Sequence, residues 1–169
     1  MWRRKILVDR GCVFLDRDGV INAKPPGETY VRRWEEFEWI PGIVDWIRLF
    51  NVLGYLVVVI TNQRGVARGV LSRDAVETIH RNMVEHLLQW GARVDDVLYC
   101  PHDEYSCECR KPRPGLILQA QKKWAIDLSR SLLIGDSEPD RRLAEAVGIP
   151  FVLVDQGTII NVITDKNAS

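Results

Sequence analysis

Two aspartates at alternate positions, Asp16 and Asp18, are the residues of this sequence best suited to chemistry. They follow the apolar run 12–15 directly, and Gly19 behind them permits a tight departure from a strand. Paired carboxylates can bind a hard cation such as Mg²⁺ through oxygen. They can also divide the roles of nucleophile and proton carrier. The alternative is a solvated turn with capping acids, and the buried strand before the pair favours chemistry.

A second constellation is rich in sulfur. Cys100 and His102 are followed closely by Cys107 and Cys109. Three thiolates and one imidazole make a closed tetrahedral set that suits structural Zn²⁺. In a reducing compartment such a cluster indicates a metal site more than a disulfide framework. The alternative is a loop with incidental free thiols. Cys12 lies in the first apolar run and is expected to pack there.

The elements that must position these residues alternate along the chain. Short apolar runs predict five strands, and stripes of apolar residues at helical spacing, such as Val76, Ile79 and Met83, predict helices between them. This order predicts an α/β fold with a doubly wound, mainly parallel, Rossmann-like sheet. The strands are expected over 12–15, 55–60, 97–99, 132–134 and 151–154.

In such a sheet, ligands bind beyond the carboxyl ends of the strands. Asp16, Thr61, Cys100 and Asp136 each stand at or just after a predicted strand end. The sequence therefore predicts that these residues converge on one edge of the sheet. The polar, proline-containing segment 23–39 is expected to form a flap over that edge.

Composition limits the classes of function. The chain has 169 residues, 46% hydrophobic and 27% charged, which fits a single soluble domain over 1–169. Its formal net charge of zero argues against a dedicated nucleic-acid binder. The apolar run 6–8 is too short for a signal-peptide core, and no stretch is long enough to span a membrane. We expect a cytoplasmic monomer with a frayed tail over 166–169.

Four motifs in order resemble those of the haloacid dehalogenase superfamily. They are Asp16-x-Asp18-Gly-Val, Thr61, Lys111 and Gly-Asp136-x-x-x-Asp140. The resemblance implies a phosphatase of this fold without a large cap domain. Asp16 would be the nucleophile that forms an aspartyl-phosphate. Asp18 would protonate the leaving oxygen and then activate water.

The same resemblance implies the ligands of the reaction. Mg²⁺ would be held by the side chains of Asp16 and Asp136 and by the backbone carbonyl of Asp18, while Thr61 and Lys111 would hold the phosphoryl group. Phosphoryl transfer needs mainly positioning and charge neutralisation, which agrees with this set.

Asp140 has two interpretations at this point. In the segment Ser137-Glu138-Pro139-Asp140 it could belong to a helix start that Ser137 caps. It could equally support the metal site.

The pattern Cys-Pro-His, then Cys-x-Cys-Arg-Lys-Pro, resembles more narrowly the D-glycero-D-manno-heptose 1,7-bisphosphate phosphatases and the histidinol-phosphate phosphatases. This implies a small phosphorylated metabolite as substrate, first the heptose bisphosphate, losing its 7-phosphate. Asn62, Gln63, Arg64 and Arg110 would contact it, with the planar fork of Arg110 on its distal part. A zinc-pinned loop over 100–109 would hold Arg110 and Lys111 over the phosphate.

Other functions remain open from the sequence. A histidinol-phosphate phosphatase would need an acidic pocket, for which Glu28, Glu104 and Glu108 are candidates. A nucleic-acid 3′-phosphatase and a non-catalytic binding module are the remaining alternatives. Arg64, Ser137 and the proline-rich stretch 23–28 depart from the heptose and histidinol pattern, and they lie in segments that would set specificity.

Overall fold

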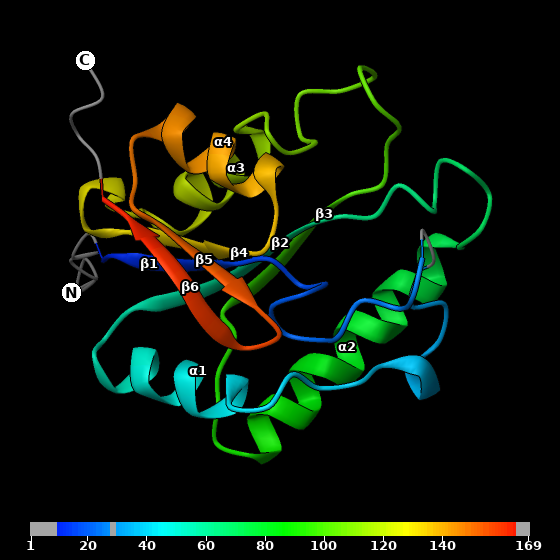
Figure 1. Ribbon diagram of the computed structural model, residues 1–169, viewed down its shortest axis with the longest axis horizontal. Helices are drawn as coiled ribbons and strands as arrows, with labels where there is room; N and C mark the ends of the chain where they lie inside the picture. The colour runs from blue at the N-terminus through cyan, green and yellow to red at the C-terminus, as the bar shows by residue number, and fades with distance from the viewer. Residues whose placement is uncertain (1–9, 28–29, 165–169) are drawn as a thin grey trace, which may run out of the picture.

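Apolar, β-branched runs form the strands of a mostly parallel sheet. The computed structural model of the chain describes residues 10–27 and 30–164. Within these ranges there is a six-stranded sheet of order β3-β2-β1-β4-β5-β6 (Figure 1). Strands β1 to β5 run parallel, and β6 is antiparallel to β5. The strands are β1 (Cys12–Leu15), β2 (Leu56–Asn62), β3 (Asp96–Cys100), β4 (Leu132–Gly135), β5 (Phe151–Asp155) and β6 (Thr158–Ile163).

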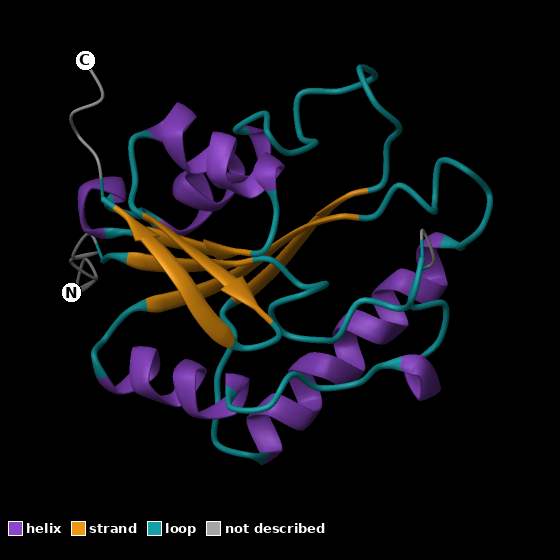
Figure 2. Ribbon diagram, in the orientation of Figure 1, coloured by secondary structure: helices purple, strands orange, loops and turns teal. Residues whose placement is uncertain are grey.

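Helices cover both faces of this sheet (Figure 2). Val13 and Leu15 of β1 pack on the side of α1 and α2, whereas Cys12 and Phe14 pack on the side of α3 and α4. All four side chains are fully buried, so both faces of β1 are core, as the doubly wound prediction requires. The helices are α1 (Ile43–Val52), α2 (Arg73–Gln89), α3 (Gly115–Trp124) and α4 (Glu138–Val147), with the 3-10 turns η1 (Trp34–Glu36) and η2 (Leu128–Arg130).

The predicted strands are confirmed, but their number is wrong by one. β6 follows a tight turn at Gln156 and Gly157, which both have positive φ, 44° and 83°. Two-residue hairpin turns of this kind favour glycine and asparagine, so Gln156 gives a weak turn signal. β2 also continues past Ile60 to Asn62, because it pairs with β3 as far as Cys100.

The flap over 23–39 is anchored by aromatic packing. Phe37 is buried and stacks on Trp34 with ring centroids 4.8 Å apart. Trp39 lies 4.9 Å from Phe37 and 5.1 Å from Trp90, just beyond the end of α2. The C-terminal part of the flap is therefore fixed to the body of the protein. Glu28, which the sequence places in this segment, lies outside the described residues, as does the tail 166–169.

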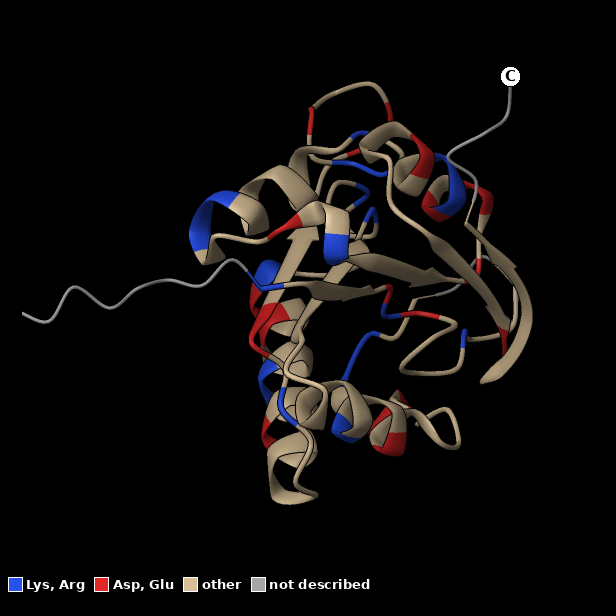
Figure 3. Ribbon diagram, turned by 90° about the vertical axis from the view of Figure 1, so that its left-hand side faces the viewer, with Lys and Arg blue, Asp and Glu red and all other residues tan. Residues whose placement is uncertain are grey.

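Charged residues of both signs interleave along the helices and loops in the view of Figure 3. The formal net charge is zero. None of the helices in the described ranges is long and apolar enough to cross a membrane.

Candidate active site

The turn after β1 brings the aspartate pair to the end of β4. Asp16 follows β1 directly, and its backbone N–H donates to the carbonyl of Ile134 at 3.0 Å. Gly19 has a φ of +92°, and a Cβ at this position would lie 1.9 Å from Oδ2 of Asp136. Only glycine fits both the conformation and the contact. The ends of β1 and β4 therefore lie side by side, with their carboxylates close together.

A cavity of about 230 Å³ opens at this edge of the sheet, beneath the flap. The four residues predicted to be catalytic all line it. The structure thus brings together the predicted nucleophile, the predicted proton carrier and the two predicted phosphoryl ligands. The complete lining is Asp16, Asp18, Lys24, Pro25, Gly27, Tyr30, Thr61, Asn62, Lys111, Ser137 and Pro139.

Lys111 is buried between two carboxylates. Its Nζ lies 2.8 Å from Oδ1 of Asp16 and 2.7 Å from Oδ1 of Asp140, and it donates to the carbonyl of Ile60 at 3.1 Å. Burial alone would lower the pKa of Lys111, but the carboxylates of Asp140 and Asp16 raise it above its usual value. The side chain is therefore a fixed cation beside Asp16, which suits the binding of phosphoryl oxygens.

Asp140 belongs to this charged group. Its side chain is fully buried. Ser137 is the N-cap residue of α4, but its hydroxyl donates to Oδ2 of Asp140 at 2.5 Å instead of accepting a backbone N–H. Gly135 makes the close approach possible, because a Cβ there would lie 2.5 Å from Cβ of Asp140. The capping role predicted for the Ser137 side chain is therefore wrong, and Asp140 instead holds Lys111.

Three carboxylates at this edge can hold a cation. Asp16, Asp136 and Asp140 each offer an oxygen, and these atoms lie within 4.8 Å of one another. Oδ1 of Asp136 is buried and has no hydrogen-bond partner in the described part of the chain. Burial, and after it the charge of Asp140, raises the pKa of Asp16 to about 7. Crowded oxygen ligands that repel one another fit Mg²⁺, which prefers oxygen and offsets their charge.

The carboxylate of Asp18 is held by three neighbouring side chains. Arg17 donates from Nη2 to both oxygens, at 2.8 and 3.0 Å. Asn22 donates to Oδ1 at 3.0 Å and Gln63 to Oδ2 at 2.9 Å. Burial would raise the pKa of Asp18, but the charge of Arg17 and the hydrogen bonds from all three residues hold it below its usual value. The orientation of this carboxylate is thus fixed from several sides.

Three residues of this edge were not found from the sequence. Arg17 is buried and, besides Asp18, contacts His80, a buried residue of α2. Lys24 of the flap lies 2.5 Å from Oδ2 of Asp136. A signal existed for Arg17, a cation between two acids directly after a buried strand. Lys24 and His80 carry no local signal, because long-range packing places them.

The four predicted substrate-binding residues take different positions. Asn62 lines the cavity, and its amide pairs with the backbone of Lys111 at 3.0 and 3.2 Å. Gln63 is buried behind the cavity, where it donates to Asp18 and to Thr61. The side chain of Arg64 faces the loop after β3 instead. It pairs there with two acids, Asp103 and Glu104.

Arg110 faces a second cavity of about 450 Å³. This cavity adjoins the catalytic one, because Lys111 and Pro139 line both. Nη1 of Arg110 is buried, and no residue in the described ranges accepts a hydrogen bond from it. An unpaired guanidinium nitrogen next to the catalytic cavity suits the binding of a second anionic group.

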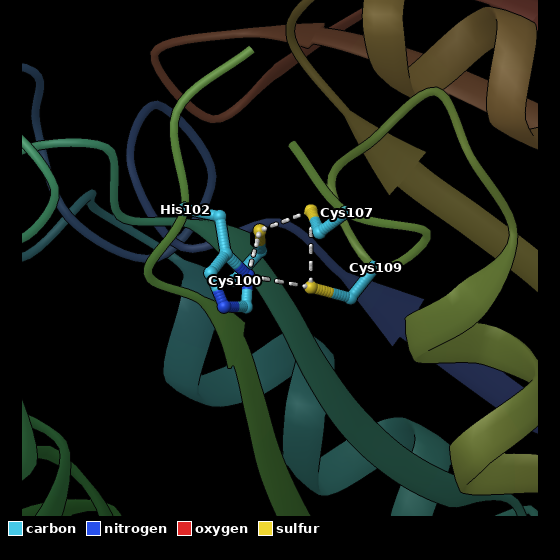
Figure 4. Close-up of side chains that lie close together, drawn as sticks. All are labelled: Cys100, His102, Cys107 and Cys109. Atoms are coloured by element: carbon cyan, nitrogen blue, oxygen red, sulfur yellow. Dashed lines mark hydrogen bonds between the residues drawn. The ribbon is translucent and has the colours of Figure 1, made fainter. Parts of the chain in front are cut away.

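The four predicted zinc residues lie together at the end of β3 (Figure 4). Sγ of Cys100 is 3.5 Å from Sγ of Cys107 and 3.6 Å from Nδ1 of His102. Sγ of Cys109 is 3.4 Å from Cys107 and 3.2 Å from His102. Two sulfurs on a zinc-centred tetrahedron would lie roughly 3.8 Å apart at the usual zinc–sulfur distance. The set therefore fits structural Zn²⁺, and Cys12 is buried in β1 among apolar residues.

Comparison with known proteins agrees with this site. A family model described as HAD-hydrolase-like matches residues 108–164. The D-glycero-beta-D-manno-heptose-1,7-bisphosphate 7-phosphatase of Rhodopseudomonas palustris is 50% identical over 149 residues, which are 83% of this chain and 81% of that protein. The chain belongs to the haloacid dehalogenase-like phosphatases. This membership confirms the phosphatase activity and the fold that the four motifs imply.

Two further relatives of this phosphatase extend the comparison. The D-glycero-alpha-D-manno-heptose-1,7-bisphosphate 7-phosphatase of Mycobacterium tuberculosis H37Rv is 41% identical, covering 80% of this chain and 72% of that protein. A crystal structure of the D,D-heptose 1,7-bisphosphate phosphatase from B. bronchiseptica, described as complexed with magnesium and phosphate, superposes with a TM-score of 0.79. That protein is 33% identical, and the match covers 87% of this chain and 83% of the other.

Proposed function

We propose that this phosphatase removes the 7-phosphate of D-glycero-D-manno-heptose 1,7-bisphosphate through an aspartyl-phosphate on Asp16. The observation that carries the proposal is the catalytic cavity, in which Asp16 lies against the buried cation Lys111 and beside Asp18 and Thr61. The relatives named as heptose-bisphosphate 7-phosphatases support the choice of substrate.

The first step transfers the phosphoryl group to the enzyme. A carboxylate oxygen of Asp16 forms a bond to phosphorus while the bond from phosphorus to the sugar oxygen breaks. In the free site the pKa of Asp18 lies below its usual value, so Asp18 must first take up a proton as the anionic phosphate group binds. It then gives this proton to the sugar oxygen, which leaves as an alcohol.

The second step releases phosphate. Asp18, now ionised, takes a proton from water as the water oxygen bonds to phosphorus, and the bond to Asp16 breaks. Both aspartates return to their starting forms.

The remaining residues stabilise charge during these steps. Thr61 and Lys111 would hold the phosphoryl oxygens, and Asp140 keeps Lys111 in place. Asp16 and Asp136 would hold Mg²⁺ by their side chains, with the Asp18 carbonyl as a further ligand. When bound, the ion would neutralise charge on the carboxylate and the phosphate.

The second phosphate of the substrate would lie toward Arg110. Its cavity adjoins the catalytic one, and its buried Nη1 has a free donor. Guanidinium groups bind phosphate through two parallel hydrogen bonds, so Arg110 suits this role.

Of the acids expected in a histidinol-phosphate pocket, the two in the described part of the chain, Glu104 and Glu108, do not line the catalytic cavity. Glu104 pairs with Arg64, and the side chain of Glu108 is 91% exposed. Glu28 lies outside the described residues. We therefore place the histidinol-phosphate reaction second, and the nucleic-acid 3′-phosphatase reaction behind it because the net charge is zero.

A substrate screen tests the proposal. We would measure kcat/KM for both anomers of the heptose bisphosphate, for histidinol phosphate and for a 3′-phosphorylated oligonucleotide at low and high salt. The β anomer comes first, since it is named for the relative at 50% identity. The heptose bisphosphate should have the highest value. A large preference for histidinol phosphate, or salt-sensitive turnover of the oligonucleotide, would overturn the substrate assignment.

We also infer the setting of the enzyme. One zinc would be held by the 100–109 loop and one Mg²⁺ in the cavity. The cluster cysteines are free thiols in this structure, and thiolate metal sites persist in a reducing compartment such as the cytoplasm. We propose a monomer with a single domain over 1–169.

A further inference from the structure

Arg17 is an almost fully buried guanidinium between the catalytic cavity and α2. It is 1% exposed. Nε and Nη2 donate to the carboxylate of Asp18, with the shortest contact 2.8 Å. Nη1 points the other way and lies 3.0 Å from Nε2 of His80. All three guanidinium nitrogens are thus engaged, two with Asp18 and one with α2.

The contact with His80 has a defined direction. Arginine offers only donors, so Nε2 of His80 must accept, and the single ring proton of the neutral imidazole sits on Nδ1. His80 is 6% exposed, and its ring packs edge-on to Tyr99 at a centroid distance of 5.4 Å. The ring is therefore fixed by packing, and its acceptor nitrogen is aimed at Arg17.

We infer that His80 is a positioning residue for the reaction, acting through Arg17 on Asp18. The inference rests on the proposed function, in which Asp18 gives its proton to the leaving oxygen. Hydrogen bonds from two nitrogens of one guanidinium orient a carboxylate only while the plane of the guanidinium is fixed. Without the His80 acceptor, Nη1 would be a buried donor with no partner, and the guanidinium would rotate to find one. Asp18 would then lose its alignment with the leaving oxygen.

The consequence depends on the leaving group. An alcohol such as the 7-hydroxyl of the sugar leaves poorly and needs the proton from Asp18. The nitrophenolate of p-nitrophenyl phosphate leaves without a proton. The ratio kcat/KM reports only the steps up to departure of the leaving group and excludes the later release of phosphate. It therefore isolates the need of each leaving group for a proton. Misalignment of Asp18 should therefore reduce kcat/KM for the sugar phosphate far more than for the aryl phosphate.

Two amide substitutions separate positioning from packing. In His80→Gln the amide oxygen can take the place of Nε2 and accept from Arg17. In His80→Asn the amide reaches only to the place of Nδ1, so the acceptor is lost. His86→Asn is the matched control on the same helix, since His86 contacts the carbonyl of Asn82 and not the Arg17 group.

We would measure kcat/KM of wild type and variants for heptose 1,7-bisphosphate and p-nitrophenyl phosphate, with thermal melting as a check of folding. His80→Asn should lose about tenfold more activity on the sugar phosphate than on the aryl phosphate, part of the roughly 100- to 10,000-fold that a positioned general acid contributes. His80→Gln and His86→Asn should keep the wild-type ratio. Arg17→Lys replaces the planar guanidinium by a single ammonium group, which cannot hold the Asp18 carboxylate in one plane. It should show the same larger fall in kcat/KM on the sugar phosphate, even if His80→Asn does not fold.

The outcomes distinguish the inference from the proposed function. Wild-type turnover of both esters tests the function alone. Equal losses on the two esters in His80→Asn and Arg17→Lys would overturn the positioning role while leaving the phosphatase reaction in place.

Discussion

Lys111 stands at the centre of a buried group of charges. It lies within 2.8 Å of both Asp16 and Asp140, and its side chain is only 3% exposed. Two carboxylates this close would repel each other strongly without it. The lysine therefore has a structural role as well as the proposed role in binding phosphate.

Removing that cation should destabilise the fold. We expect Lys111→Met to lower the free energy of unfolding by about 3 to 5 kcal/mol, because it leaves uncompensated buried charge. Urea unfolding without added metal measures this. The matched control is Lys123→Met. Lys123 is half-exposed and pairs with Asp96, so this substitution should lower the free energy of unfolding by less than about 1 kcal/mol. Equal effects of the two substitutions would contradict the account.

His80 should make the fold sensitive to acid. Burial first, and then the charge of Arg17, lower the pKa of His80 to about 3, below its usual value near 6.5. Between these pH values the unfolded chain binds a proton at His80 that the folded chain does not. The free energy of unfolding should therefore fall as the pH falls below about 6.5. The charged groups facing the ring are Arg17 and Asp18, with Tyr99 packed beside it.

Urea unfolding at pH 7 and pH 5 measures this dependence. The loss of stability between the two pH values should be smaller in His80→Gln than in wild type, because glutamine does not titrate. An identical loss would show that His80 does not titrate in this way.

Single residues were predictable where the fold alone brings them together. Asp16, Thr61 and Asp136 sit on adjacent strand ends, so topology places them. The position of Arg64 was not predictable, because a long side chain on a loop follows the nearest acids, here Asp103 and Glu104. Asp140 became interpretable only with its contact to Lys111.

At the level of elements, the 100–109 loop positions the backbone of Lys111, from which the side chain reaches into the cavity. The loop starts at the end of β3 and runs from Cys109 into Arg110 and Lys111. Glycine is required behind it, because a Cβ at Gly115 would lie 2.3 Å from the carbonyl of Glu108. A metal at the cluster would hold both ends of this loop.

We expect purified wild-type protein to contain about one zinc per chain. Cys109→Ser should lose the metal, melt at a lower temperature and turn over more slowly, because Lys111 is no longer held by a rigid loop. Metal analysis and melting curves measure this. Cys12→Ser is the control, as Cys12 is buried in β1 away from the cluster, and it should keep its zinc. Wild-type protein prepared without chelator and free of zinc would contradict the assignment.

The sequence predicted the parallel strands and helices well because continuous apolar runs and helical stripes are strong local signals. It missed β6 because the Gln156–Gly157 turn is unusual and the strand exposes Ile159, Ile160 and Val162. The path of the flap was also not predictable, since tertiary contacts such as that of Trp39 with Trp90 determine it.

At the scale of the whole molecule, the doubly wound sheet gathers the site at one edge. β1 lies between β2 and β4 in the sheet, although β4 is far from both in the sequence. Two apolar layers, one on each face, hold these strand ends in register.

For the proposed monomer, we expect turnover per chain to be independent of protein concentration, and sedimentation velocity to show a monomer. A fall in specific activity on dilution, together with a dimer in sedimentation, would indicate that a second copy completes the site.

The central claim is that Asp16 attacks phosphorus, and Asp16→Asn tests it most directly. This substitution keeps the size of the side chain but removes the nucleophilic carboxylate. The measurement is kcat on p-nitrophenyl phosphate with Mg²⁺, for protein whose folding is verified by circular dichroism and melting. We expect a folded protein with no detectable turnover. A folded Asp16→Asn variant with wild-type turnover would contradict the assignment of Asp16 as the nucleophile.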